Sequence, residues 1–233
     1  DFLGAYMEMA KSFEKLKKYN EAIECYNKTI ELDDPTSYAL LRIGKCYEKL
    51  GNHAEALKYY NKTVHEDPLL DKGWIAITDF YVRQDNFQKA LFYVNKALGI
   101  DNENRFYWKR YATINKEMNL LEEAEYGYKK AVEFGDIQLD TWLYWIDTLQ
   151  FLGEFDTAIQ ALLQACEYFT DEYEIEYRLA GLYLMNHEDT KGKFHLSNGL
   201  RLNFKNHSLL EVLFPTVWSR KMVQNAINKH KKE

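Results

Sequence analysis

The side chains that most often do chemistry are few and scattered in this sequence. The three cysteines, Cys25, Cys46 and Cys166, lie far apart and form no Cys-x-x-Cys pair. An odd number of cysteines is typical of a reducing compartment, because oxidising compartments favour paired cysteines. Each cysteine lies in a stretch with helical periodicity, where a buried and inert thiol is the usual outcome. The cysteines therefore predict no disulfide and no nucleophile.

The histidines are equally dispersed, and only one of them lies beside acidic residues. His187-Glu188-Asp189 could bind a metal, but a solvated turn is the better interpretation, because the cluster lacks the usual soft ligands. The sequence has no glycine-rich phosphate loop, no dinucleotide fingerprint and no His-Glu-x-x-His pair. We therefore expect a protein that is not an enzyme and that uses no cofactor and no metal.

Composition narrows the classes of partner. The net charge is −6 over 233 residues, so the positive surplus that nucleic-acid binding needs is missing. No apolar run approaches the length of a membrane span. The sequence starts at Asp1-Phe2 without Met, which suggests an excised or processed segment. We expect a cytoplasmic protein, with an upstream signal, further repeats or another domain left open.

Small and bulky residues recur every 34 positions, and this period is the main feature of the sequence. Small residues that let two helices approach closely stand at Ala22, Ala56, Ala90, Ala124, Ala158 and Gly192. Bulky residues at helical spacing from them fill the space beside each contact. Residues that tolerate a left-handed turn recur with the same period, at Gly51, Asp85, Asn119, Gly153 and His187. The period predicts a repeated unit of two helices joined by a tight turn.

This pattern resembles the tetratricopeptide repeat family. The second unit matches the family best, through Leu40, Ile43, Gly44, Tyr47, Ala56, Tyr60 and Pro68. The resemblance implies an all-α fold, a right-handed superhelical solenoid of six helix-turn-helix repeats with C-terminal capping helices. We expect repeats at about 3–36, 37–70, 71–104, 105–138, 139–172 and 173–206. Ile146 replaces a small residue and Gly192 weakens a helix, so repeats five and six should pack less regularly.

The tail after residue 206 departs from the period and predicts a helical cap over residues 207–233. Pro215 suits the first turn of a helix, and Val217, Met222, Val223, Ala226 and Ile227 form an apolar face that could cover the last repeat. A basic helix that binds a membrane or a partner is the alternative. Phe214-Pro215 followed by a short basic helix also resembles repeat proteins of Bacteroidetes, which suggests a bacterial origin.

In the family, the first helices of the repeats line a concave groove that binds peptides or helices. The positions that the resemblance places in this groove are Lys11, Arg42, Lys45, Asp79, Lys109, Arg110, Leu143, Tyr144, Asp147, Phe151, Tyr177, Arg178 and Met185. The first half is basic, and the second half is richer in apolar and aromatic residues. Such a surface suits a peptide with an acidic end and an apolar end. The alternative is a solvated charged face beside packing between repeats.

The leading hypothesis is therefore a non-catalytic scaffold that binds a protein, a peptide or a helix in the groove. The family's clamp for chaperone C-termini is not supported, because Met7 and Leu41 stand where that clamp needs polar or cationic groups. A second hypothesis is self-assembly, as a homodimer or end to end, through exposed aromatic residues. A third is a regulatory segment of a larger protein.

Overall fold

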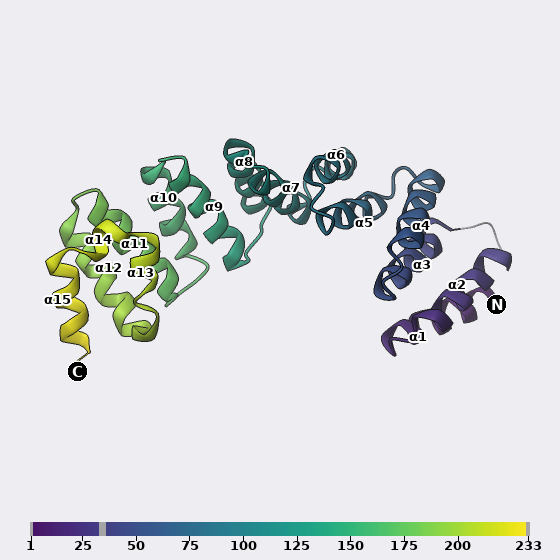
Figure 1. Ribbon diagram of the computed structural model, residues 1–233, viewed down its shortest axis with the longest axis horizontal. Helices are drawn as coiled ribbons and strands as arrows, with labels where there is room; N and C mark the ends of the chain where they lie inside the picture. Colours follow the sequence, from purple (N-terminus) through teal and green to yellow (C-terminus); the bar gives the residue numbers. More distant parts are fainter. Residues whose placement is uncertain (1, 33–35, 232–233) are drawn as a thin grey trace. The chain divides into compact units, whose positions relative to one another are not determined.

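The computed structural model describes residues 2–32 and 36–231, and no strand occurs among them (Figure 1). Consecutive helices pair as hairpins: α1 (Phe2–Lys15) with α2 (Tyr19–Leu32), α3 (Ser37–Lys49) with α4 (His53–Glu66), α5 (Asp71–Val82) with α6 (Phe87–Leu98), α7 (Arg105–Glu117) with α8 (Leu121–Glu133), α9 (Leu139–Phe151) with α10 (Phe155–Ala165), and α11 (Tyr173–Met185) with α12 (Asp189–Leu202). The tail holds η1 (Phe204–Asn206), α13 (Leu209–Leu213), α14 (Pro215–Trp218) and α15 (Lys221–His230). The predicted all-α class of consecutive helix-turn-helix pairs is confirmed.

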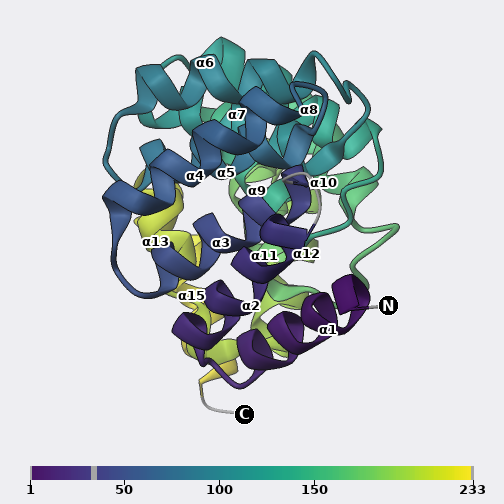
Figure 2. The same ribbon diagram turned by 90° about the vertical axis from the view of Figure 1, so that its right-hand side faces the viewer.

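The chain divides into two compact units, residues 1–134 and residues 135–233. Unit 1 holds α1 to α8, and unit 2 holds α9 to α15. Within unit 1, each first helix runs beside its own second helix, as α1 and α2 show in both views (Figures 1 and 2). Each unit is therefore built by repeating one hairpin.

The turn inside each hairpin has the same backbone geometry. Its key residue has a positive φ every 34 positions, at Lys17 (59°), Gly51 (77°), Asp85 (52°), Asn119 (58°), Gly153 (79°) and His187 (60°). In each hairpin, the second helix begins two residues after this positive-φ residue. Asn52 and Asn86 cap the second helices of their repeats by accepting the amide N–H of Glu55 and Lys89. The turns that the sequence predicts are thus confirmed.

Three tryptophans fix the connection from one hairpin to the next. The indole N–H of Trp74 donates to the carbonyl of Pro68 at 2.9 Å, that of Trp108 to Asn102 at 2.7 Å, and that of Trp142 to Asp136 at 3.1 Å. Each acceptor lies six residues before its tryptophan, in the loop that enters the first helix. The indole therefore satisfies a loop carbonyl while its ring packs beside the helices.

Close approach of the two helices explains the small residues of the period. Ala22, Ala56, Ala90, Ala124 and Ala158 have no exposed surface. A Cβ atom on Gly44 would lie 2.6 Å from the ring of Tyr60, so a larger residue would push α3 and α4 apart. Two other hairpins have an equivalent close contact, Gly127 beside Ala112 and Gly192 beside Leu184.

The expectation for the fifth and sixth repeats is half right. Ile146 is fully buried where other repeats have a small residue, and α9 packs less closely on α10 than the first helices of the other repeats pack on theirs. The expectation for the sixth repeat is wrong, because α11 and α12 pack tightly. A Cβ atom on Gly192 would lie 2.5 Å from Leu184, so this glycine permits the contact.

The tail packs on the sixth hairpin. Pro215 begins α14 as expected, and the buried residues Val217, Val223 and Ile227 belong to the predicted apolar face. α15 lies against α12, and Arg220 donates to the carbonyl of Leu184 at 2.6 Å. The Leu184 carbonyl also accepts the backbone N–H of His187 at 3.2 Å, and a cation at the C-terminal end of α11 adds a favourable charge there.

Candidate functional site

The first helices of consecutive hairpins are joined by ion pairs, so they lie side by side in each unit. In unit 1, Arg42 of α3 pairs with Glu14 of α1, and its Nε donates to Oε1 of that carboxylate at 2.8 Å. The Tyr26 hydroxyl donates to the same oxygen at 2.6 Å. We call the surface formed by the first helices of a unit its first-helix face: α1, α3, α5 and α7 form that of unit 1, and α9 and α11 form that of unit 2.

The arrangement around Glu14 is repeated one hairpin later. Glu48 accepts the Tyr60 hydroxyl at 2.7 Å and pairs at 2.6 Å with Arg83, the residue that follows α5. Burial and the neighbouring carboxylate raise the pKa of Tyr60 above its ordinary value, so the phenol remains a donor at neutral pH. Glu14 and Glu48 therefore each bind a tyrosine of their own hairpin and an arginine of the next one.

These acids change the interpretation of the basic residues that the sequence predicts in the first half of the groove, which we call the basic strip. Arg110 pairs with Asp79 at 2.9 Å, and Lys11 pairs with Glu8 of its own helix at 2.7 Å. Lys109 lies half-buried on α7. The sequence pattern missed the balancing role of Glu14 and Glu48, although both stand at one helical turn from the positions that it selected. The strip is a network of balanced charges and is not a row of cations.

Lys45 is the cation of this strip that has no ion-pair partner within residues 2–32 and 36–231. Burial lowers the pKa of its ammonium group, and the nearby Arg42 lowers it further, while the carboxylates of Asp79, Glu14 and Glu48 raise it.

In unit 2 the structure separates the predicted groove residues into two sets. Leu143 and Tyr177 are buried, and the Tyr177 hydroxyl donates to the carbonyl of Asn203 at 3.0 Å. These two side chains belong to the core and do not reach the surface, which corrects the expectation for them. Tyr144, on the next position of α9, is exposed.

Arg178 of α11 and Asp147 of α9 form an ion pair between the first helices of unit 2, with Nη1 and Oδ1 2.9 Å apart. The Arg178 side chain is 6% exposed, so this pair is nearly buried, unlike Arg110 and Asp79 in unit 1. A buried guanidinium needs such a partner, because leaving either charge alone would be costly. Arg178 therefore positions Asp147 and does not itself reach a ligand.

Three predicted residues, Asp147, Phe151 and Met185, line one pocket of about 330 Å³ in unit 2. The other lining residues are Gln150, Phe155, Val212, Leu213 and Phe214. Phe151 is 73% exposed and Val212 is 76% exposed, which is unusual for large apolar side chains. The pocket therefore combines apolar walls with one carboxylate, and its composition suits an apolar side chain of a ligand.

The tail builds one wall of this pocket. Phe214 is buried against Gly181 of α11, where a Cβ atom would lie 2.2 Å from the phenylalanine ring. Gly181 thus permits the approach of the tail to α11. Sequence reasoning missed Val212, Leu213 and Phe214 as site residues, because the tail leaves the 34-residue period from which the groove positions were taken.

Groups for catalysis are not assembled in this pocket. Among the described residues, no group of three or more His, Cys, Asp or Glu side chains could hold a metal ion. Burial raises the pKa of the Cys46 thiol to about 12, and it raises the pKa of Cys25 and Cys166 as well. None of the helices within the described ranges is long and apolar enough to cross a membrane.

Comparison with known proteins identifies the repeat. The model of the tetratricopeptide repeat family matches residues 1–64. The comparison with curated proteins gives no match. The origin in Bacteroidetes that the tail suggests stays a prediction.

Solved structures share the fold over most of the chain. The crystal structure of YrrB, described as a tetratricopeptide repeat protein with an unusual peptide-binding site, has a TM-score of 0.68 at 17% identity and covers 82% of this chain and 98% of that chain. PilF of Pseudomonas aeruginosa has a TM-score of 0.67 at 13% identity, with coverages of 91% and 97%. A tetratricopeptide repeat protein from Parabacteroides merdae has a TM-score of 0.63 at 13% identity and covers 99% of each chain.

The family match and the fold agree with the features described above. Residues 1–64 match the family directly, and the hairpins from α5 to α12 repeat the same turn geometry and the same small-residue contacts. Residues 1–64 are therefore identified as tetratricopeptide repeats, and the later hairpins share the fold of solved tetratricopeptide repeat proteins.

Proposed function

We propose that the chain is a non-catalytic scaffold that binds a protein or peptide partner on its first-helix face, with an apolar side chain of the partner anchored in the pocket of unit 2. Tetratricopeptide repeat proteins are generally scaffolds for protein interactions. The observation that carries the finer proposal is the exposed apolar surface around Phe151 and Val212, beside a pocket of about 330 Å³.

The energetics favour this pocket over the rest of the face. Binding energy usually comes from a few aromatic or apolar anchors that leave water, and exposed Phe151 can lose its solvent contact on binding. The ion pairs of unit 1 contribute less, because exposed and balanced charges add little affinity. Asp147 can accept a hydrogen bond from a backbone N–H of the partner, since its charge is already balanced by Arg178.

The part of the proposal that concerns an acidic end of the partner rests on Lys45. This side chain is half-buried on α3 and has no ion-pair partner in the part of the chain that the structure describes. An acidic group that reaches Lys45 would gain a partly desolvated ion pair. Arg42 is a poorer probe of this idea, because its charge reversal would also break the pair with Glu14.

Affinity capture from the source cells with matched variants tests the proposal. Phe151→Glu places a charge at the pocket, whereas Phe194→Glu places one at a 62% exposed phenylalanine on α12 of the same unit. We expect the wild type and Phe194→Glu to retain the same partner by mass spectrometry, and Phe151→Glu to lose it. Equal retention by both variants would count against the pocket.

Self-assembly and a homodimer stay predictions, and the same pair of variants addresses them. Light scattering over a range of concentrations gives the mass in solution. A dimer that Phe151→Glu dissociates and Phe194→Glu does not would mean that the pocket binds a second copy of the chain.

A further inference from the structure

Repeat three contains a stack of three aromatic rings on the side of its second helix. Trp74 stacks on Tyr93, with ring centroids 6.1 Å apart and planes 18° apart. Tyr93 stacks in turn on Tyr81, at 5.5 Å and 2°. The three rings join α5 to α6 and close the space beside the second helix.

Repeat two has the same stack with its outermost ring missing. Tyr59 and Tyr47, each 34 positions before Tyr93 and Tyr81, stack at 5.5 Å and 28°. Leu40 stands 34 positions before Trp74, so an aliphatic side chain replaces the indole. Repeats four and five have tryptophan at this position too, namely Trp108 and Trp142. The outer face of the Tyr59 ring is therefore left without the indole that covers its counterpart.

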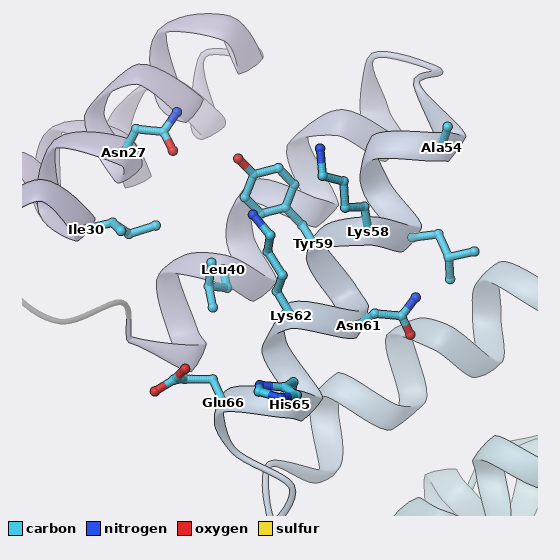
Figure 3. A pocket seen from close by; sticks show the side chains of 11 residues that line it. Asn27, Ile30, Leu40, Ala54, Lys58, Tyr59, Asn61, Lys62, His65 and Glu66 are labelled. Atoms are coloured by element: carbon cyan, nitrogen blue, oxygen red, sulfur yellow. The ribbon is translucent and has the colours of Figure 1, made fainter.

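A pocket of about 810 Å³ lies at this place, between α2 and α4 (Figure 3). Ile30 extends from α2 toward Leu40 and Tyr59, which form the apolar part of the lining together with Leu57. The polar part of the lining consists of Asn27, Lys58, Asn61, Lys62, His65 and Glu66. The volume lies in the range of about 300–1,000 Å³ that is usual for ligand sites, so the pocket can take an aromatic ring and the backbone that carries it.

We propose that this pocket binds a tryptophan side chain presented by a protein partner, in the place that Trp74 fills in repeat three. The indole would stack on Tyr59 as Trp74 stacks on Tyr93, and its N–H could donate to the side-chain oxygen of Asn27 or Asn61. The ring would cover apolar surface of Ile30 and Leu40. An offset stack of this kind adds stabilisation beyond the apolar area that it buries.

The charges at the rim favour an acidic residue next to the tryptophan. Lys62 has its ammonium group 4.7 Å from the centre of the Tyr59 ring and has no ion-pair partner within the described ranges. Lys58 is already held by Glu55 at 3.1 Å. A partner carboxylate near the indole would therefore meet Lys62 first.

The tryptophans of a second copy of this chain do not fit the role. Trp74, Trp108 and Trp142 each donate to a loop carbonyl of their own chain. Trp145 is buried, and Trp218 stacks on His207 at 5.8 Å. Withdrawing any of the five would disrupt its own repeat or the tail, so the occupant is a different protein. The pocket belongs to α2, α3 and α4 and shares no residue with the pocket of unit 2, so the two proposals can fail independently.

The test uses the full chain and an acetylated, amidated peptide of sequence Gly-Asp-Trp-Asp-Gly, followed by the shifts of backbone amide signals in NMR. We expect saturable shifts at the residues that line the pocket. A peptide with Ala for Trp should give none, and one with Asn for both Asp should bind more weakly. Absence of shifts at the pocket with millimolar peptide, or shifts confined to the first-helix face, would overturn the proposal.

A variant that fills the pocket with a tryptophan of the chain itself tests the proposal further. Leu40→Trp should complete the stack of repeat two, raise the melting temperature and weaken peptide binding by at least about tenfold, since the indole of the peptide would lose its place. Leu69→Trp is the control, because Leu69 is 76% exposed and lies outside the pocket. Peptide binding by Leu40→Trp that is as tight as binding by the wild type and by Leu69→Trp would contradict the proposal. If that variant does not fold, Tyr59→Leu removes the stacking face and should also weaken binding; unchanged binding would then contradict it.

Discussion

The first-helix faces of the two units contain equivalent aspartate–arginine ion pairs in different environments. Asp79 and Arg110 of unit 1 recur as Asp147 and Arg178 of unit 2, each 68 positions later, which is two repeats. Arg110 keeps 41% of its side-chain surface exposed, but Arg178 keeps only 6%. The carboxylates are similarly exposed, at 29% for Asp79 and 24% for Asp147, so the two pairs differ mainly in the exposure of the arginine.

A glycine distinguishes the sixth repeat from the others at one position of the first helix. Lys45, Asp79, Thr113, Asp147 and Gly181 follow one another at intervals of 34 residues, so this position has a side chain in repeats two to five and none in repeat six. The glycine lets Phe214 approach α11, and the tail then forms one wall of the pocket beside Asp147. No such approach of a tail occurs in unit 1 among the described residues.

The largest effect is expected when the buried pair is broken. Arg178→Ala should cost about 3–5 kcal/mol in the free energy of unfolding, because it leaves the Asp147 carboxylate partly buried without its partner. Urea unfolding followed by circular dichroism measures this difference. The matched variant Arg110→Ala should cost only about 0–1 kcal/mol, as exposed pairs do. Equal losses in both variants would mean that the tail does not change the environment of the pair.

The next effect concerns the glycine that admits the tail. Gly181→Ala places a Cβ atom 2.2 Å from the original position of the Phe214 ring, so the ring must move. We expect a loss of about 1–3 kcal/mol from overpacking, despite the better helix propensity of alanine. Thermal unfolding gives the sign. A rise in melting temperature would show that Phe214 can retreat without cost.

The sequence predicts the repeated architecture well, because its determinants are local and periodic. The turns at Gly51 and Asp85 and the alanine contacts recur every 34 positions, so each copy supports the assignment of the others. The packing of the sixth repeat could not be inferred from propensity alone. Gly192 is a poor helix former, but it fits against Leu184, and that contact appears only in three dimensions.

The candidate site could be predicted only in part. Phe151 and Met185 follow from the family positions, whereas Val212, Leu213 and Phe214 come from a tail that leaves the period. The ion pairs that connect neighbouring first helices of unit 1 join residues 28 to 35 positions apart, from Arg42 with Glu14 to Arg83 with Glu48. A single repeat considered by itself shows the cation and not its partner, so the sequence suggested a basic strip that the structure shows to be balanced.

A smaller effect is expected for the two cysteines that lie in different units. Burial raises the pKa of Cys46 in unit 1 to about 12, and it raises the pKa of the less buried Cys166 in unit 2 as well. Raised pKa values favour the neutral thiol, so both should react slowly with iodoacetamide at pH 8 and faster as the pH rises. Mass spectrometry of timed samples should find Cys166 modified before Cys46. The reverse order would indicate that α3 opens more readily than α10.

Hydrogen–deuterium exchange of the full chain, with and without the captured partner, tests the central claim most directly. We predict that the partner slows exchange in α9, at the end of α11 and in residues 209–214, where the pocket of unit 2 lies. Slower exchange confined to the outer residues of α10 and α12, with no change around Phe151, would contradict binding on the first-helix face.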